Sequence, residues 1–402
     1  MLPGALVRAH GNAGALMSWK PLFSRSLAAA PERLHFAAHS HHLWPDAAFE
    51  GQMAAVETAE RLADDKWDYI LGDLWAEAQR EIAAELALPD PATIVFAPNT
   101  HEFVMRLVSA VEQRPVRILS TDGEFHSFRR QIARLAEAGD IALETVATEP
   151  FESFEERSLA AAELTDADII FVSQRFFGTG RAFARVREVA SLAPATAMVV
   201  IDGYHSFMAE PTDFSAIAER AFFLAGGYKY AMSGEGVAFL HAPPGWAERP
   251  RFTGWYAEFE DLSLPPGAVG YAPDARRLLG STFDASGLFR FVHVRRALAE
   301  AGANTVAISQ HARDLQEQFL ASVQRGEAGA LSEAELLNPP GDGFGARFLA
   351  FRHGRAADWK AALRERGVVT DVRGDVIRFG FGAYQDAADV AALLDRAGEV
   401  IK

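Results

Sequence analysis

The chain has 402 residues, of which 49% are hydrophobic, and its formal net charge is −15. This length and apolar content suffice for a large core and two domains. The acidic balance argues against a nucleic-acid partner and against an anionic membrane surface. The chain has no cysteine, which excludes disulfides, thiolate metal sites, iron–sulfur clusters and a cysteine nucleophile.

The first 31 residues carry Arg8, Lys20 and Arg25 and no acid. This composition has a faint likeness to a transit peptide, but we favour an N-terminal arm that packs on the body of the protein or on a partner. No apolar run approaches the roughly 20 residues needed to span a bilayer. We therefore expect a cytoplasmic protein with no membrane partner.

A short strand and a histidine-rich loop are predicted over residues 34–46. His39, His41 and His42 are adjacent in this loop and lack the helical or hairpin spacing of metal ligands. We therefore favour a loop that lines a polar cleft, and we expect no metal. A helical pattern follows over 47–86, where apolar residues recur every three or four positions.

The next strand, at 93–97, leads to Asn99 and Thr100, and a helix is expected over 102–111. Backbone N–H groups and a hydroxyl at such a helix start can hold a phosphate. The alternative is a plain N-cap, in which one of these side chains only satisfies the free donors of the helix. The local sequence leaves both interpretations open.

From residue 117 onward, apolar strands alternate with amphipathic helices. Strands are predicted at 117–121, 141–146, 168–174, 197–202, 221–225 and 237–241, and helices near 128–138, 184–192 and 213–219. Continuous apolar strands of this kind predict an α/β fold with a mainly parallel sheet that is covered on both faces.

Ligands of such sheets bind at the carboxyl ends of the strands. One pocket is therefore expected to collect Asn99, Phe125, Ser173, Asp202 and Lys229. Lysine is rare in this chain, and Lys229 follows the paired glycines at 226 and 227. Because lysine can lose its proton and form an imine whereas arginine stays protonated, a lysine here indicates a task that arginine cannot perform.

The segment from 243 to 273 is rich in loops, and an α+β pattern follows it. Helices are expected at 286–301, 305–323, 356–366 and 385–401, with strands near 347–352, 367–372 and 376–381. We predict an N-terminal segment (1–45) that joins the small domain, a large domain (46–275) and a small C-terminal α+β domain (276–402).

Together the strand-end residues describe a pyridoxal phosphate site. Lys229 would form an imine with the cofactor, and Asp202 would keep the pyridine nitrogen protonated so that the ring accepts electrons. Asn99 and Thr100 would hold the phosphate, and Phe125 would stack on the ring. Each of these residues alone could be an ordinary helix cap, loop residue or core residue, but this structural explanation would have to hold at every position at once.

The sequence resembles the fold type I pyridoxal phosphate enzymes of the class V aminotransferase group, and within that group kynureninase. The likeness covers most of the chain from about residue 34. Its motifs are Asp202-Gly-Tyr-His205, Tyr228-Lys229-Tyr230 followed by Gly234 and Gly236, Gly254-Trp255-Tyr256, and the tail at 367–373 with Ile377-Arg378.

This resemblance implies the role of each residue. Lys229 is the Schiff-base lysine, Asp202 pairs with the pyridine nitrogen, and Arg378 binds the substrate α-carboxylate through its bidentate fork, with Ser40 also at the substrate. Further cofactor contacts are implied for Asn99, Thr100, Phe125, Ser173, His205 and Tyr228. Trp255 and Thr282 would reach the site of the partner subunit in a homodimer with shared active sites.

Several positions depart from the kynureninase pattern. The Pro-Ser/Thr-Asp run after the stacking phenylalanine reads 126–128 His-Ser-Phe, and the Gly-Asn-Ser loop reads 38–40 Ala-His-Ser. The histidine and asparagine that recognise the ring substituent in animal kynureninases correspond to Glu258 and Thr282. The Tyr-Thr-Gly of the mid-sheet loop reads 178–180 Gly-Thr-Gly. These changes leave the cofactor chemistry intact and leave the aryl substrate open.

The leading hypothesis is a kynureninase-like hydrolase of tryptophan catabolism, which cleaves the Cβ–Cγ bond of kynurenine or a related amino acid. The alternative is a class V aminotransferase, which passes the amino group of a small amino acid to a 2-oxo acid. A cysteine desulfurase is disfavoured because it uses a cysteine persulfide. A binding protein without catalysis is disfavoured by the complete lysine–acid pair.

Overall fold

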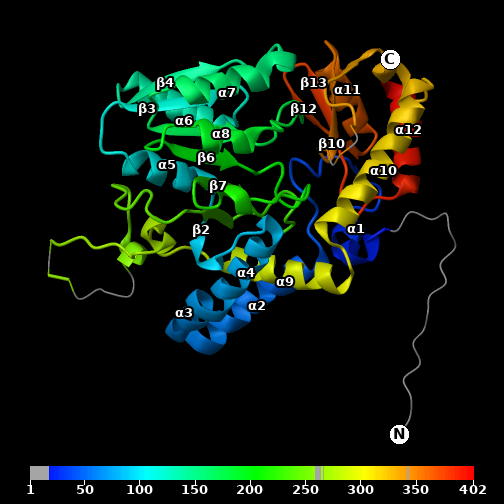
Figure 1. The fold of residues 1–402 in the computed structure, drawn as a ribbon. Coiled ribbons are helices and arrows are strands. Elements are labelled where there is room, and N and C mark those ends of the chain that lie inside the picture. The colour runs from blue at the N-terminus through cyan, green and yellow to red at the C-terminus, as the bar shows by residue number, and fades with distance from the viewer. Residues whose placement is uncertain (1–17, 259–263, 266, 342, 344) are drawn as a thin grey trace, which may run out of the picture.

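The computed structural model describes residues 18–258, 264, 265, 267–341, 343 and 345–402. A seven-stranded sheet with the order β2-β8-β7-β6-β5-β3-β4 forms the centre of its larger part (Figure 1). The strands are β2 (Ile94–Ala97), β3 (Val116–Thr121), β4 (Ile141–Val146), β5 (Ile169–Ser173), β6 (Met198–Asp202), β7 (Ala221–Gly226) and β8 (Ala238–His241). β8 runs antiparallel to both of its neighbours, and the other pairs are parallel. The predicted mainly parallel sheet is confirmed.

Helices cover this sheet, as its apolar strands require, because every residue of β5 and β7 is buried. The helices are α2 (Asp46–Leu62), α3 (Lys66–Tyr69), α4 (Trp75–Leu86), α5 (Thr100–Ala110), α6 (His126–Glu137), α7 (Phe154–Leu164), α8 (Val186–Leu192) and α9 (Ser286–Glu300). α9 lies along α2 in the lower part of Figure 1.

Two predicted helices differ from the observed ones. The pattern over 47–86 is not one helix, because α2 ends where Ala63 takes a positive φ of 47°. The helix predicted at 213–219 is only a short 3-10 turn at Ser215–Ile217. There the Asp213 carboxylate accepts hydrogen bonds from both the backbone N–H and the hydroxyl of Ser215, a local pattern that competes with helix formation.

The C-terminal part forms a second layer beside the large sheet (Figure 1). Its four-stranded sheet has the order β12-β13-β10-β9. The elements are β9 (Glu335–Leu336), β10 (Phe348–Arg352), β12 (Asp371–Arg373) and β13 (Val376–Gly380), with the helices α10 (Thr305–Gln324), α11 (Ala356–Glu365) and α12 (Ala387–Val400). Its core centres on Phe319, Trp359 and Phe379.

The N-terminal segment contacts this second layer. After the short helix α1 (Ser24–Ala28), β1 (Leu34–His35) pairs in parallel with β11 (Val368–Val369). The proposed domain limits at 45 and 275 stay predictions, and residues 1–17 of the predicted arm lie outside the described part of the chain. No helix within the described ranges is long and apolar enough to cross a membrane.

Candidate active site

A pocket of about 340 Å³, called here the lysine pocket, lies at the carboxyl ends of β5, β6 and β7. It brings together most of the residues predicted from the sequence. Its lining contains Asn99, Thr100, Phe125, Ser173, Asp202, His205, Tyr228 and Lys229, together with His101, Ser127, Arg175, Phe177 and Tyr204. The topology explains this convergence, because parallel strands end at one edge of the sheet.

Neighbouring strands and two glycines fix the geometry of the lysine pocket. Ser173 and Asp202 are register partners at the ends of β5 and β6. β7 ends at Gly226, where an added Cβ would lie 2.2 Å from the hydroxyl oxygen of Tyr204. A Cβ at Gly227 would lie 2.5 Å from Ser233 Oγ. Glycine is therefore required at both positions for the close approach of these side chains.

Lys229 is a buried amine, only 5% exposed. Its Nζ lies 2.9 Å from His205 Nε2 and 4.3 Å from the ring centre of Tyr204. Burial lowers the pKa of Lys229, although the nearby Asp202 carboxylate acts in the opposite direction. A lysine held in this way spends part of its time as the neutral, nucleophilic amine.

Asp202 and His205 complete the group around this lysine. The Asp202 carboxylate accepts a hydrogen bond of 2.8 Å from the backbone N–H of Tyr204, and burial raises the pKa of Asp202. Burial lowers the pKa of His205 well below its ordinary value, and the neighbouring Lys229 and Arg378 lower it further. His205 is therefore neutral near pH 7, and its Nδ1 has no hydrogen-bond partner among the described residues.

The start of helix α5 also lines the lysine pocket, through Asn99 and Thr100. Asn99 Oδ1 accepts a hydrogen bond of 3.1 Å from the backbone N–H of Glu102, so Asn99 caps the helix. This cap satisfies the N–H of Glu102 and leaves those of Thr100 and His101 available to an anion, so it is compatible with the predicted phosphate site. Thr100 adds a hydroxyl there, and Tyr228 packs its ring on Tyr204 at 4.9 Å.

Arg378 is not among the residues that line the lysine pocket. It lies on β13, is 2% exposed, and donates hydrogen bonds to the Phe177 carbonyl and to Asp371. Arg373 shares this carboxylate, with Nη1 2.7 Å from Asp371 Oδ1. Arg378 Nε has no partner within the described part of the chain. The predicted substrate arginine is thus already engaged by an acid of its own domain.

The histidine-rich loop sends its side chains to separate places. His39 is fully buried and stacks on Phe348 at 4.6 Å, whereas His41 stacks on Tyr228 at 5.0 Å. His42 packs edge-on against Tyr384 at 4.9 Å. In the described ranges no group of three His, Cys, Asp or Glu residues is placed to hold a metal. Ser40 lies half-buried outside the lining of the lysine pocket.

Trp255 and Thr282 lie together, but not in the lysine pocket. Trp255 Nε1 donates a hydrogen bond of 3.2 Å to Thr282 Oγ1, and Trp255 is 45% exposed. Thr282 lines a larger hollow of about 490 Å³, and His101 lines both spaces. The lysine pocket, although smaller, is the candidate site because it contains the buried amine and acid.

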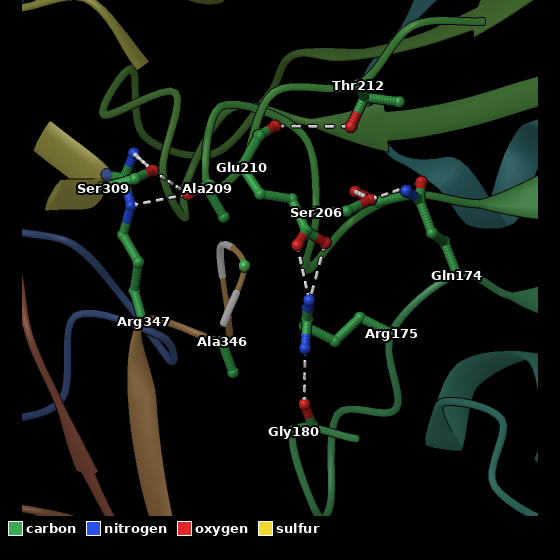
Figure 2. Close-up of polar contacts among 12 residues, drawn as sticks. Gln174, Arg175, Gly180, Ser206, Ala209, Glu210, Thr212, Ser309, Ala346 and Arg347 are labelled. Atoms are coloured by element: carbon green, nitrogen blue, oxygen red, sulfur yellow. Dashed lines mark hydrogen bonds and ion pairs between the residues drawn. The ribbon is translucent and has the colours of Figure 1, made fainter. Parts of the chain in front are cut away.

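Sequence reasoning missed the arginine that forms one wall of the pocket. Figure 2 shows Arg175 between Glu210 and the Gly180 carbonyl, with its Nε 3.0 Å from Glu210 Oε1 and its Nη1 2.7 Å from the carbonyl oxygen. Arg347 extends from the C-terminal part to the Ala209 carbonyl in the same view. These contacts fix the loops behind the lysine pocket.

Two further neighbours of the site were also missed. Tyr204 lies beneath Lys229, and Glu124 is a fully buried carboxyl directly before Phe125. The sequence did hold a signal for both, because each lies just beyond the end of an apolar strand. The signal was weak, since a tyrosine or a glutamate at such a position is also typical of a plain loop.

Comparisons with known sequences match parts of the chain. Residues 308–396 match the family model described as Kynureninase C-terminal domain. Isopenicillin N epimerase from Streptomyces clavuligerus is 28% identical over 230 residues, which are 54% of this chain and 57% of that protein. The match thus spans little more than half the length of this curated relative.

Solved structures match nearly the whole chain. The apo cysteine desulfurase from Thermococcus onnurineus NA1 has a TM-score of 0.77 at 16% identity and covers 96% of this chain and 99% of its own. The cysteine desulfurase CsdA from Escherichia coli has a TM-score of 0.75 at 16% identity, with coverage of 95% and 97%. A C-DES variant with glycine covalently linked to its PLP cofactor also has a TM-score of 0.75 at 16% identity, with coverage of 93% and 98%. The fold is therefore the type I fold of pyridoxal phosphate-dependent enzymes, as predicted.

Proposed function

We propose that this protein is a pyridoxal phosphate-dependent enzyme that acts on an amino acid, and that it is a kynureninase-like hydrolase. The observation that carries the cofactor assignment is the buried Lys229, held beside His205 and Asp202 at the carboxyl edge of the sheet. A buried amine whose hydrogen-bond partner is a neutral histidine is costly to keep unless it has a chemical use.

The residues present fit the cofactor. Lys229 would bind it covalently, Asp202 would pair with the pyridine nitrogen, and Phe125 would pack on the ring from the pocket wall. Asn99 and Thr100 would hold the phosphate at the start of α5, where backbone N–H groups favour an anion. Ser173, His205 and Tyr228 would provide the remaining cofactor contacts.

When bound, pyridoxal phosphate supplies an electron sink for negative charge that develops at the substrate Cα. Lys229 Nζ, partly neutral because burial lowers its pKa, takes the proton from Cα and returns it later. His205 stays neutral and holds Nζ in place at 2.9 Å. The surrounding Tyr204 and Phe125 rings exclude water from the amine.

The kynureninase-like step adds one water across the Cβ–Cγ bond, so that kynurenine and water give anthranilate and alanine. Its support is the Kynureninase C-terminal domain match over 308–396, which includes Arg378. Arg378 would bind the substrate α-carboxylate in place of Asp371, its present partner. Ser40, from the N-terminal segment, would contact the same substrate.

A homodimer with shared active sites is part of this proposal. Trp255 and Phe252 are 45% and 54% exposed, and Phe252 lines the 490 Å³ hollow beside the lysine pocket. Covering such aromatic side chains with a second copy would remove them from water. Trp255 and Thr282 would then lie at the site of the partner subunit.

The other reaction classes are distinguished by what they require. A class V aminotransferase needs a 2-oxo acid as acceptor, whereas the hydrolase forms alanine from kynurenine alone. Epimerisation at Cα is a second candidate because the matched relative is Isopenicillin N epimerase. A desulfurase that passes sulfur to its own cysteine is excluded, since the chain has none.

The decisive experiment labels the lysine directly. We expect borohydride reduction of the protein reconstituted with pyridoxal phosphate to attach the cofactor to Lys229, as peptide mass mapping would show. Lys229→Ala should remain unlabelled and lose at least about 10³-fold in turnover, while Lys360→Ala on α11 should behave as wild type. Label on the Lys229→Ala protein would overturn the cofactor assignment. Alanine that appears only with an added 2-oxo acid would replace the hydrolase with the aminotransferase.

A further inference from the structure

Glu124 is a buried carboxyl group beside the lysine pocket to which the proposed reaction assigns no task. It is 0% exposed and lies between β3 and Phe125. Its Oε1 accepts hydrogen bonds from the Thr121 hydroxyl at 2.7 Å and from the Ser173 backbone N–H at 3.1 Å. Its Oε2 lies 2.5 Å from Ser173 Oγ. Because Ser173 lines the lysine pocket, the Ser173 hydroxyl connects Glu124 to that pocket.

The surroundings of Glu124 favour its protonated form. The side chains that hydrogen-bond to Glu124, Thr121 on β3 and Ser173 on β5, are both uncharged. The charged group that acts on it is Asp202 at the end of β6, beyond which lies Lys229. Burial raises the pKa of Glu124 to about 7, and the negative charge of Asp202 also raises it, although the hydrogen bonds from Ser173 and Thr121 lower it in part.

We propose that Glu124 is a positioning residue whose protonation state sets the direction of the Ser173 hydroxyl, with which it shares a hydrogen bond. The proton resides on Oε2, because Oε1 already accepts two hydrogen bonds. In the protonated state Oε2–H donates to Ser173 Oγ, and the Ser173 hydroxyl is free to donate into the lysine pocket. In the ionised state Ser173 donates to Oε2 and offers the pocket only lone pairs.

This inference rests on the proposed function only in its consequence for the cofactor. A pocket wall that changes from donor to acceptor with pH changes the hydrogen bonding of whatever polar group Ser173 contacts. Asp202 is the register partner of Ser173 on the next strand. When Glu124 loses its proton, its new negative charge acts on the Asp202 carboxylate. Glu124 thus links the protonation of the pocket wall to that of the acid that would hold the pyridine nitrogen.

The proton itself can be followed without cofactor. We expect the infrared spectrum of the apo protein to show a carboxylic acid C=O band that disappears as the pH rises, with a midpoint of about 7. Glu124→Gln should remove this component, and Glu137→Gln, at an exposed position on α6, should keep it. Ser173→Ala should move the midpoint to higher pH, because it removes a hydrogen bond that stabilises the ionised carboxylate.

A second measurement tests the link to the cofactor. In the reconstituted protein we expect the pH dependence of the visible absorbance to contain a component with the same midpoint, which is absent from Glu124→Gln and from Ser173→Ala. If Glu124→Gln fails to fold, as circular dichroism would show, the infrared midpoint of Ser173→Ala serves instead, and an unshifted midpoint there would overturn the inference. A Glu124 band that titrates at about 4.3, the ordinary value for glutamate, would overturn the inference. If the infrared transition has the expected midpoint but the protein binds no cofactor, the proposed function is rejected and the inference about Glu124 stands.

Discussion

The two sides of the lysine pocket hold their polar groups in different ways. On the strand side, Asp202 and Lys229 lie at the ends of β6 and β7, and among the described residues the hydrogen-bond partner of Lys229 is the neutral His205. On the side of the C-terminal part, Arg378 is bound by Asp371 and by the Phe177 carbonyl. One side therefore offers groups that await a ligand, and the other offers a group that is already occupied.

This difference has a consequence for binding. The strand-side groups are fixed by backbone register and can meet a cofactor without rearrangement, which keeps the cost of binding low. Arg378 can take a substrate carboxylate only if Asp371 gives up its place, and Arg373 then remains as the partner of that acid. We therefore expect changes on the strand side to affect turnover, and changes on the arginine side to affect mainly the apparent affinity for substrate.

Asp202→Asn should produce the largest effect. An amide of the same size cannot keep a neighbouring ring nitrogen protonated, so we expect kcat to fall by about 10² to 10⁴-fold, the range of general acid–base contributions. The cofactor should stay attached through Lys229, which absorbance and borohydride labelling would show. The exposed Asp64→Asn serves as the control. Loss of the cofactor without any change in kcat of the loaded fraction would contradict this role.

Arg378→Lys should have a smaller effect that appears mainly in KM. The lysine keeps the positive charge but loses the fork that binds a carboxylate with two parallel hydrogen bonds. We expect KM to rise by about tenfold, which corresponds to about 1.4 kcal/mol, with little change in kcat. Steady-state kinetics with kynurenine would measure both parameters.

Arg373→Lys is the matched control for this substitution, because Arg373 contacts the same carboxylate from a half-exposed position. It should leave KM close to that of the wild type. Equal effects of the two substitutions would show that the pair acts only as a structural ion-pair cluster around Asp371. In that case the contrast between the two sides of the pocket would not extend to substrate binding.

The sequence predicted the strand side well, for a physical reason. A buried apolar strand can be recognised locally, and parallel strands place the residues after their carboxyl ends in one place. Asn99, Ser173, Asp202 and Lys229 could therefore be assigned to one pocket without a structure, as their common lining confirms.

The arginine side could not be predicted in the same way. The pairing of Arg378 with the carbonyl of Phe177 joins residues that are 201 positions apart. The ion pair of Arg175 with Glu210 joins residues 35 positions apart. Such contacts depend on how separate layers pack, and no local pattern of charge or hydrophobicity records that packing. Ser40 was assigned to the substrate by resemblance alone, and that assignment stays a prediction.

The smallest expected effect concerns stability and lies in the histidine-rich loop next to the C-terminal part. His42 is 3% exposed and packs against Phe23 and Tyr384. Burial lowers the pKa of His42 to about 3, whereas an unfolded histidine has a pKa of about 6.5. The unfolded chain therefore binds the proton first, and the contribution of neutral His42 to stability is lost as the pH falls from about 6.5 toward 3.

Replacing His42 with phenylalanine should flatten this part of the pH profile. The loss attributed to His42 is at most about 1.4 kcal/mol of unfolding free energy for each pH unit, and phenylalanine suits an aromatic site that leaves Nε2 without a partner among the described residues. Urea unfolding between about pH 7 and pH 4 would measure the slope in both proteins. His41→Asn, at an exposed position of the same loop, should retain the slope of the wild type. An unchanged slope in His42→Phe would contradict this prediction, because it would show that His42 binds its proton equally well in the folded and the unfolded protein.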